Sequence, residues 1–213
     1  MIRIITIDRE YGSGANEIAR KLAERLGWKL WDQALTTEIA KVARCPLADV
    51  EAREERRDPL FHTLFKGFMH GSFEGNINTQ PLELLDSDHI LKITHKLIDH
   101  AAAEGRCVIV GRGAPYHLQD RDDSFHVFIY APDEEKIRRL KQAGNRKEDA
   151  RALILSVDRD RAAFIKKYFG KEWPNRHLFH LMINSGVGDE AVVENILAAV
   201  SAMDRRESKA RAI

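Results

Sequence analysis

The sequence predicts an α/β protein in which helices cover both faces of a five-stranded parallel sheet. Two observations support this prediction. Short runs rich in β-branched and other apolar residues alternate along the chain with amphipathic helical patterns. These runs are apolar along their whole length instead of at every second residue, which is typical of strands buried on both faces of a parallel sheet.

Five segments are expected to be strands, because each is too short for a helix and is bounded by glycine or polar residues. They are residues 2–7, 28–31, 107–111, 125–131 and 177–185. Helices are expected at residues 16–25, 33–43, 87–103, from 132 onward, 150–168 and 189–203. Pro132 is placed just inside its helix, where its missing N–H does no harm. The polar tail at residues 204–213 is expected to be frayed.

Residues 46–86 differ in character from the rest of the chain. Two short helical patterns, at residues 46–58 and 59–71, precede a polar loop that contains glycine and asparagine. The alternation of strands and helices resumes after this loop. We therefore expect a core formed by residues 1–45 and 87–213, with residues 46–86 as a helical insertion that covers a site.

Composition and charge disfavour several classes of protein. Hydrophobic residues make up 44% and charged residues 31% of the chain, which favours a folded domain over disorder. The net charge of +1 gives no electrostatic signature of nucleic-acid or membrane binding. Cys45 and Cys107 form no CxxC pattern, and no run of about 18 apolar residues occurs. We expect a cytoplasmic protein that binds neither nucleic acid nor membrane.

The first predicted strand runs into a glycine-rich turn, REYGSGANE, and then into a helix. This is the layout of a phosphate-binding loop, in which backbone N–H groups and the N-terminus of the helix attract phosphate oxygens. If Gly12 and Gly14 are the last glycines of that motif, Ala15 stands where its lysine is expected. Glu17 stands where the hydroxyl that binds magnesium would be. The sequence therefore predicts a phosphate-binding loop without its lysine.

Four blocks of the chain, taken in order, resemble the cytidylate kinase-like family, a divergent branch of the nucleoside monophosphate kinases. The blocks are IDREYGSGANEIARKLAERLGWKLWD, VIVGRGAPYHL, DRDRAAFIKKYFGKEW and INSGVGDEAVVENI. The resemblance implies a P-loop NTPase-like fold, with residues 46–86 as the subdomain that binds a nucleoside monophosphate and residues at about 145–176 as a lid. It also implies transfer of the γ-phosphoryl group of ATP, with Mg²⁺, to a small-molecule nucleotide such as CMP or dCMP.

The same resemblance assigns roles to individual residues. It implies that ATP binds at the loop, which comprises Arg9, Gly12, Ser13, Gly14, Ala15, Asn16 and Glu17. The acceptor is expected at Asp32, Arg112, Asp158 and Arg161. Arg112, Arg159 and Arg161 are the expected catalytic cations, since arginine can contact two phosphate oxygens at once. Glu38 stands where the family has an arginine, which weakens the case for CMP, and Gly113 replaces an aspartate.

Several assignments leave alternatives open. Glu17 could hold Mg²⁺, or it could cap the helix by bonding back to Gly14. Arg159 and Arg161 also fit a solvated helix face, because their neighbourhood is rich in charge. For the whole chain, the alternative to a kinase is a catalytically weak or inactive nucleotide sensor. A third hypothesis is an RNA-associated protein that uses the basic helix at residues 150–168.

Overall fold

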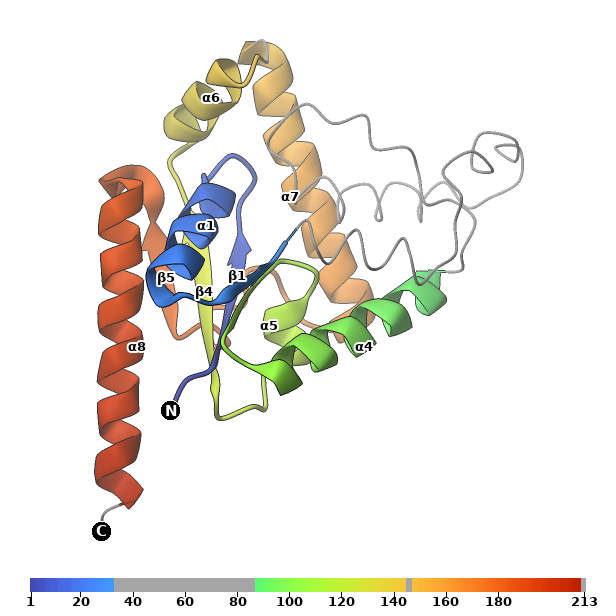
Figure 1. Ribbon diagram of the computed structural model, residues 1–213. Helices are drawn as coiled ribbons and strands as arrows, with labels where there is room; N and C mark the ends of the chain where they lie inside the picture. The colour runs from blue at the N-terminus through green and yellow to red at the C-terminus, as the bar shows by residue number, and fades with distance from the viewer. Residues whose placement is uncertain (33–86, 145–146, 212–213) are drawn as a thin grey trace.

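The computed structural model describes residues 1–32, 87–144 and 147–211 (Figure 1). Its parallel strands are β1 (Ile4–Arg9), β2 (Lys29–Trp31), β3 (Cys107–Val110), β4 (Ser124–Tyr130) and β5 (Leu181–Asn184). They form one sheet in the order β2-β3-β1-β4-β5, so the predicted five-stranded parallel sheet is confirmed. The chain crosses from one side of β1 to the other between β3 and β4. Open α/β sheets bind their ligands at the carboxyl ends of the strands near such a crossing.

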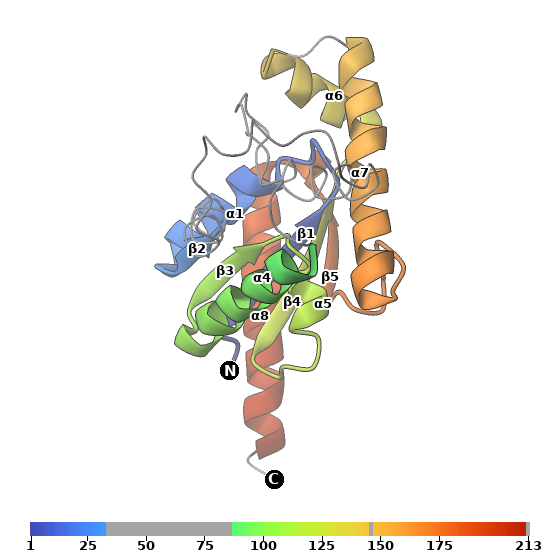
Figure 2. The same cartoon turned by 90° about the vertical axis from the view of Figure 1, so that its right-hand side faces the viewer.

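Helices cover both faces of this sheet (Figure 2). They are α1 (Ala15–Leu26), α4 (Ser87–Glu104), α5 (Ala114–His117), α6 (Asp133–Gln142), α7 (Lys147–Phe169) and α8 (Asp189–Arg211), with a short 3₁₀ turn, η1 (Ser185–Val187). α1 and α8 pack on one face, and α4 and α5 pack on the other. None of the helices in the described ranges is long and apolar enough to cross a membrane.

The core has a separate layer of side chains on each face of the sheet. Ile5 and Ile7 of β1 point toward α1 and α8, where they meet Ile18 and Val192. The neighbouring residue Ile4 belongs to the opposite layer, with side chains of α4 and α5. Because both faces are covered, the strands are apolar at successive positions, as the sequence pattern predicted.

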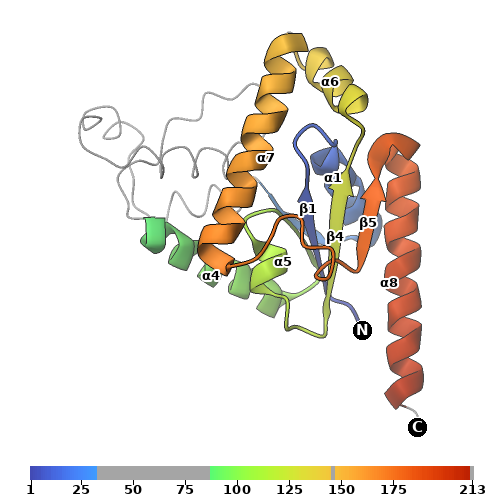
Figure 3. The same cartoon turned by 180° about the vertical axis from the view of Figure 1, so that it is seen from behind.

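α6 and the first turns of α7 lie beyond the carboxyl end of the sheet (Figure 3). α6 follows β4, which pairs with β1 as far as Arg9 and Ile129. Because β1 and β4 are neighbours, α6 begins beside the glycine-rich loop that follows β1. α7 then runs back along the side of β4 and packs Phe164 and Ile165 against Phe128. Both helices can therefore contact the loop.

Several predicted boundaries were wrong. β1 extends to Arg9, because its last two residues still pair with β4. Residues 177–180 are not part of β5, which begins at Leu181. Pro132 is the N-cap of α6 and not its first residue, since its ψ of 145° is extended. The tail predicted to be frayed is helical to Arg211, and the Asp204 carboxylate anchors it by accepting a hydrogen bond from the N–H of Ile2 at 2.6 Å. The helix predicted at residues 33–43 and the insertion at 46–86 lie outside the described residues.

Candidate functional site

The loop between β1 and α1 depends on two glycines. Gly12 and Gly14 have φ angles of 79° and 77°, which side chains other than that of glycine rarely adopt. A Cβ atom on Gly12 would lie 3.1 Å from the Cβ of Lys136. One on Gly14 would lie 2.7 Å from the Nη1 of Arg139. The backbone conformation therefore favours glycine at both positions, and at Gly12 the close approach of α6 adds to this preference.

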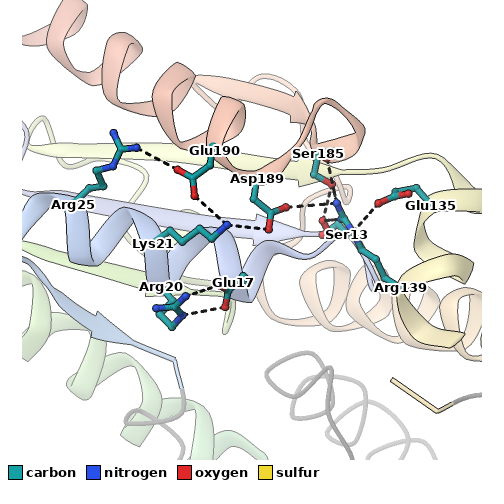
Figure 4. Close-up of polar contacts among 10 residues, drawn as sticks. All are labelled: Ser13, Glu17, Arg20, Lys21, Arg25, Glu135, Arg139, Ser185, Asp189 and Glu190. Carbon is teal, nitrogen blue, oxygen red and sulfur yellow. Dashed lines mark hydrogen bonds and ion pairs between the residues drawn. The ribbon is translucent and has the colours of Figure 1, made fainter. Parts of the chain in front are cut away.

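Arg139 of α6 joins the loop to the turn after β5 (Figure 4). Its Nη1 donates to the carbonyl of Ser13 and, at 2.9 Å, to the Oγ of Ser185. Its Nη2 donates to the carbonyl of Ser185 at 3.2 Å, and its Nε lies 2.9 Å from the Oε1 of Glu135. The Oγ of Ser185 also donates to the carbonyl of Ser13 at 2.6 Å. Three segments that are distant in sequence thus meet at one guanidinium.

Lys136 is a second cation of α6 against the loop. Its side chain is buried, and its Nζ lies 3.0 Å from the Oε2 of Glu10 and 2.9 Å from the Oδ1 of Asp133. Burial lowers the pKa of Lys136, but the hydrogen bonds to Asp133 and Glu10 outweigh burial and raise it above its ordinary value. The ammonium group therefore stays charged beside the loop.

A pocket of about 560 Å³ opens between the loop, α6 and the turn after β5. Its wall combines glycine backbone and two guanidinium groups, at Gly12, Gly14, Arg138, Arg139, Gly186 and Gly188, with the carboxylates of Glu17, Glu135 and Asp189. The volume suits a ligand of nucleotide size. α1 begins at the same loop, and its N-cap, Gly14, makes no side-chain capping hydrogen bond. The part of the wall formed by glycine backbone and guanidinium groups is therefore suited to an anionic ligand.

α7 contacts the loop from another direction. The Oδ1 of Asp158 accepts a hydrogen bond from the N–H of Tyr11 at 2.8 Å. The Nη1 of Arg161 donates to the carbonyl of Arg9 at 2.6 Å and to the Oδ1 of Asp158 at 3.2 Å. The structure thus places two expected acceptor residues, Asp158 and Arg161, on the loop backbone. The side chain of Arg159 is instead 74% exposed, with its Nε 3.8 Å from the Oδ1 of Asp160.

Arg9, Asp32 and Arg112 gather at the carboxyl ends of β1, β2 and β3. Both arginines are buried, and a Cβ atom on Gly111 would overlap the Nη1 of Arg9. Arg112 has a φ of 59° and lies between two glycines, Gly111 and Gly113, whose φ angles are also positive. Burial lowers the pKa of Arg112 to about 10, while the charge of Asp32 raises it and that of Arg9 lowers it. Arg112 directly follows the strand predicted at residues 107–111, and this position agrees with the observed geometry.

A family model described as the cytidylate kinase-like family matches residues 4–187. The chain belongs to this family. The resemblance found in the four sequence blocks is therefore confirmed. No curated protein matches the chain.

Solved structures share the fold of this cytidylate kinase-like chain. An uncharacterized protein from Eubacterium ventriosum is 22% identical, with a TM-score of 0.68 over 95% of this chain and 99% of that one. The shikimate kinase from Bacteroides thetaiotaomicron is 14% identical, with a TM-score of 0.54 over 94% and 99% of the two chains. The shikimate kinase from Acinetobacter baumannii, solved in complex with shikimate, is 15% identical, with a TM-score of 0.52 over 95% and 94%. At these identities the likeness shows the P-loop kinase fold alone.

Glu17 does not cap α1 in this cytidylate kinase-like chain. Its Oε2 accepts from the Nε of Arg20 at 3.0 Å, and this hydrogen bond holds the pKa of Glu17 below its ordinary value. The predicted capping box to Gly14 is therefore wrong, because the Glu17 carboxylate pairs with Arg20, one turn later on the helix, instead of bonding back to Gly14. The carboxylate is half-exposed at the edge of the pocket, so its role toward Mg²⁺ stays a prediction.

Sequence reasoning missed Lys136, Arg139 and Ser185 as residues of the site. Ala15, where the lysine is expected, is the first residue of α1 and is fully buried in the core. The order of the strands in the sheet is the feature that could have identified Lys136 and Arg139 as site residues. Once β4 is placed beside β1, the helix that follows β4 must begin near the loop, and its basic residues Lys136 and Arg139 become candidates.

Proposed function

We propose that this chain is an ATP-dependent kinase that transfers the γ-phosphoryl group to a nucleoside monophosphate, with CMP, dCMP or a related small molecule as the acceptor. The observation that carries the proposal is the arrangement of two polar regions around one loop. The pocket lies on the β5 side of the loop, and the cluster of Arg9, Asp32 and Arg112 lies on the β2 side. A kinase needs such a pair of sites, because donor and acceptor phosphates must approach each other.

The pocket on the β5 side of the loop, which we call the donor side, suits ATP. Its phosphates would accept hydrogen bonds from the N–H groups of the loop, and the N-terminus of α1 would add partial positive charge. The base and ribose would occupy the pocket beside Arg138 and Arg139, since guanidinium groups stack on flat rings.

Mg²⁺ would arrive bound to the phosphates of ATP. A phosphate-bound Mg²⁺ keeps several waters and needs few protein ligands. We propose that Glu17 contacts it through water after releasing Arg20. Within the described ranges, no group of three or more histidine, cysteine, aspartate or glutamate side chains could hold a metal ion.

The cluster of Arg9, Asp32 and Arg112, which we call the acceptor side, suits a phosphate dianion. Arg112 would bind its oxygens together with Arg9, which the resemblance assigns to ATP but which lies beside Arg112 and Asp32. Asp32 would orient both arginines. We propose that residues 46–86 form the acceptor-binding subdomain and that the region at about 145–176 acts as a lid. Closure over both substrates would exclude water and prevent wasteful hydrolysis of ATP.

Turnover on a panel of acceptors tests this proposal. The protein is incubated with ATP–Mg²⁺ and CMP, dCMP, UMP, AMP or GMP, and ADP and the nucleoside diphosphate are measured. Arg112→Ala should reduce turnover by on the order of 10³-fold, as loss of a transition-state arginine does in related reactions. Arg121→Ala, which removes a surface arginine paired with Asp123, is the matched control and should leave turnover unchanged.

The same experiment separates the kinase from the alternative. Binding of ATP without turnover on any acceptor would support a nucleotide sensor on the same fold. The buried methyl group of Ala15 in place of the loop lysine favours that alternative. Absence of nucleotide binding at millimolar concentration would refute both functions.

A further inference from the structure

We infer that Lys136 supplies, from α6, the phosphate-binding ammonium group that the loop lacks at Ala15. The inference rests on the proposed function, because the phosphates in question are those of the donor nucleotide. A neighbouring position of α1 does not provide the charge, since Glu17 and Arg20 neutralise each other on the exposed side of the helix. A cation for the phosphates must therefore come from another element.

The backbone of α6 at Lys136 lies directly on the loop. A Cβ atom on Gly12 would be 3.1 Å from the Cβ of Lys136 and 3.4 Å from its Cα and its carbonyl oxygen. From there the side chain extends to Glu10, where Nζ lies 3.0 Å from Oε2. The aliphatic part of Lys136 thus follows the loop from Gly12 back to Glu10. Its ammonium group ends beside Glu10, outside the pocket that Gly12 and Gly14 line, so the phosphates but not the base or ribose would reach it.

The partners of this ammonium group leave it able to bind phosphate. An ammonium has three N–H donors, and Glu10 and Asp133 accept two of them. The side chain of Lys136 is 6% exposed, whereas that of Asp133 is 62% exposed. Asp133 can therefore turn away to solvent, while Lys136 cannot. A polyphosphate, which carries more charge than one carboxylate, would take the third donor and displace Asp133.

Among the other cations near the loop, Arg138 lines the pocket but is exposed and pairs with Glu135, whereas Arg139 and Arg161 contact the loop itself. The guanidinium of Arg139 donates hydrogen bonds to Ser13 and Ser185 and pairs with Glu135, so it joins three segments of the fold. Arg161 holds the carbonyl of Arg9. Lys136 instead pairs with two carboxylates, which an anionic ligand can displace more readily than it can displace a contact that holds the backbone. Its compact ammonium also has the chemistry of the missing loop lysine, which a planar guanidinium does not reproduce.

Binding of polyphosphates tests the inference without requiring catalysis. ATP, inorganic tripolyphosphate and adenosine are titrated into the wild type, Lys136→Met and Lys136→Arg by calorimetry. Lys136→Met should lower the affinity for ATP and for tripolyphosphate by about 10- to 100-fold, as expected for loss of a hydrogen bond to a charged group. The affinity for adenosine should be unchanged. Lys136→Arg should retain most of the affinity. Lys141→Met, an exposed lysine of the same helix, is the matched control and should bind as the wild type does.

A second variant covers the case in which Lys136→Met fails to fold. Glu10→Gln removes a carboxylate that competes for Nζ, so tripolyphosphate should bind several-fold more tightly. Loss of a loop carboxylate also reduces the repulsion of any anion, so Asp133→Asn, which removes the exposed partner of Nζ outside the loop, is measured beside it and should also bind tripolyphosphate several-fold more tightly. A purely structural role of Lys136 predicts no gain for Asp133→Asn. The inference is overturned if Lys136→Met binds tripolyphosphate as the wild type does, if the affinities for all three ligands fall equally, or if Asp133→Asn shows no gain.

The outcome is distinguishable from failure of the proposed function. If the wild type binds ATP and tripolyphosphate but transfers no phosphoryl group, the proposed kinase activity is refuted. The binding data then still decide the role of Lys136. If the wild type is active, the kcat of Lys136→Met should also fall, because a cation beside the transferred group stabilises its charge in the transition state.

Discussion

The carboxylate of Asp158 accepts a hydrogen bond from the backbone N–H of Tyr11 at 2.8 Å and so joins α7 to the loop that follows β1. One turn later on α7, Arg161 donates to the carbonyl of Arg9 at 2.6 Å. A carboxylate and a guanidinium from one helix thus hold a donor and an acceptor of the loop backbone. The resemblance to the family implies that both side chains bind the acceptor.

Asp158→Ala distinguishes these two roles. The change leaves the N–H of Tyr11 without this acceptor, which costs about 1–3 kcal/mol when the group is buried. We expect weaker ADP binding and a lower melting temperature, with little change in the KM of the acceptor at saturating ATP. Asp122→Ala, at an exposed position, serves as the control. A rise confined to the KM of the acceptor would restore the role that the resemblance implies.

The pH dependence of stability provides a second test of Asp158. Burial raises its pKa to about 6, although Arg161 and the N–H of Tyr11 lower it. The folded protein therefore binds this proton more tightly than the unfolded chain, and stability falls as the pH rises from about 4 to about 6. Over this pH range the free energy of unfolding should fall by about 3 kcal/mol. Urea unfolding of Asp158→Asn, which cannot ionise, should lack this fall, and a pH profile identical to that of the wild type would argue against the buried carboxyl.

His126 should shift stability in the opposite direction. Burial, with a smaller effect of His180, lowers the pKa of His126 to about 4, and its Nδ1 lies 2.7 Å from the Oγ1 of Thr6. The unfolded chain therefore binds the proton more tightly, and stability falls as the pH drops from about 6.5 to about 4. His126→Asn should unfold with a difference between pH 7.5 and pH 5 that is about 2 kcal/mol smaller than in the wild type. An unchanged difference would show that His126 titrates normally in the fold.

The sheet and the loop could be predicted from the sequence because their signals are local. Apolar runs mark the strands, and the glycines at positions 12 and 14 adopt the positive φ angles that a tight turn needs. The cations beside the loop could not be predicted in this way. In the sequence, Lys136 and Arg139 look like ordinary charged residues of a solvated helix. Their role depends on the order of the strands and on the packing of α6 against the loop. Long-range packing also decided the contacts of Asp158.

Gly111→Ala tests the position of Arg9 on the acceptor side. Gly111 has a φ of 69°, and a Cβ atom there would overlap the Nη1 of Arg9. Gly27→Ala is a matched control, because its φ of 63° brings the same backbone strain but no atom of the described residues lies within 4 Å of the new Cβ. We expect the control to lose about 1–2 kcal/mol of stability with activity intact. Gly111→Ala should lose more stability and should also raise the KM of the acceptor, while ADP binds as in the wild type. If both variants behave alike in melting temperature and in KM, the guanidinium of Arg9 has no role in binding the acceptor.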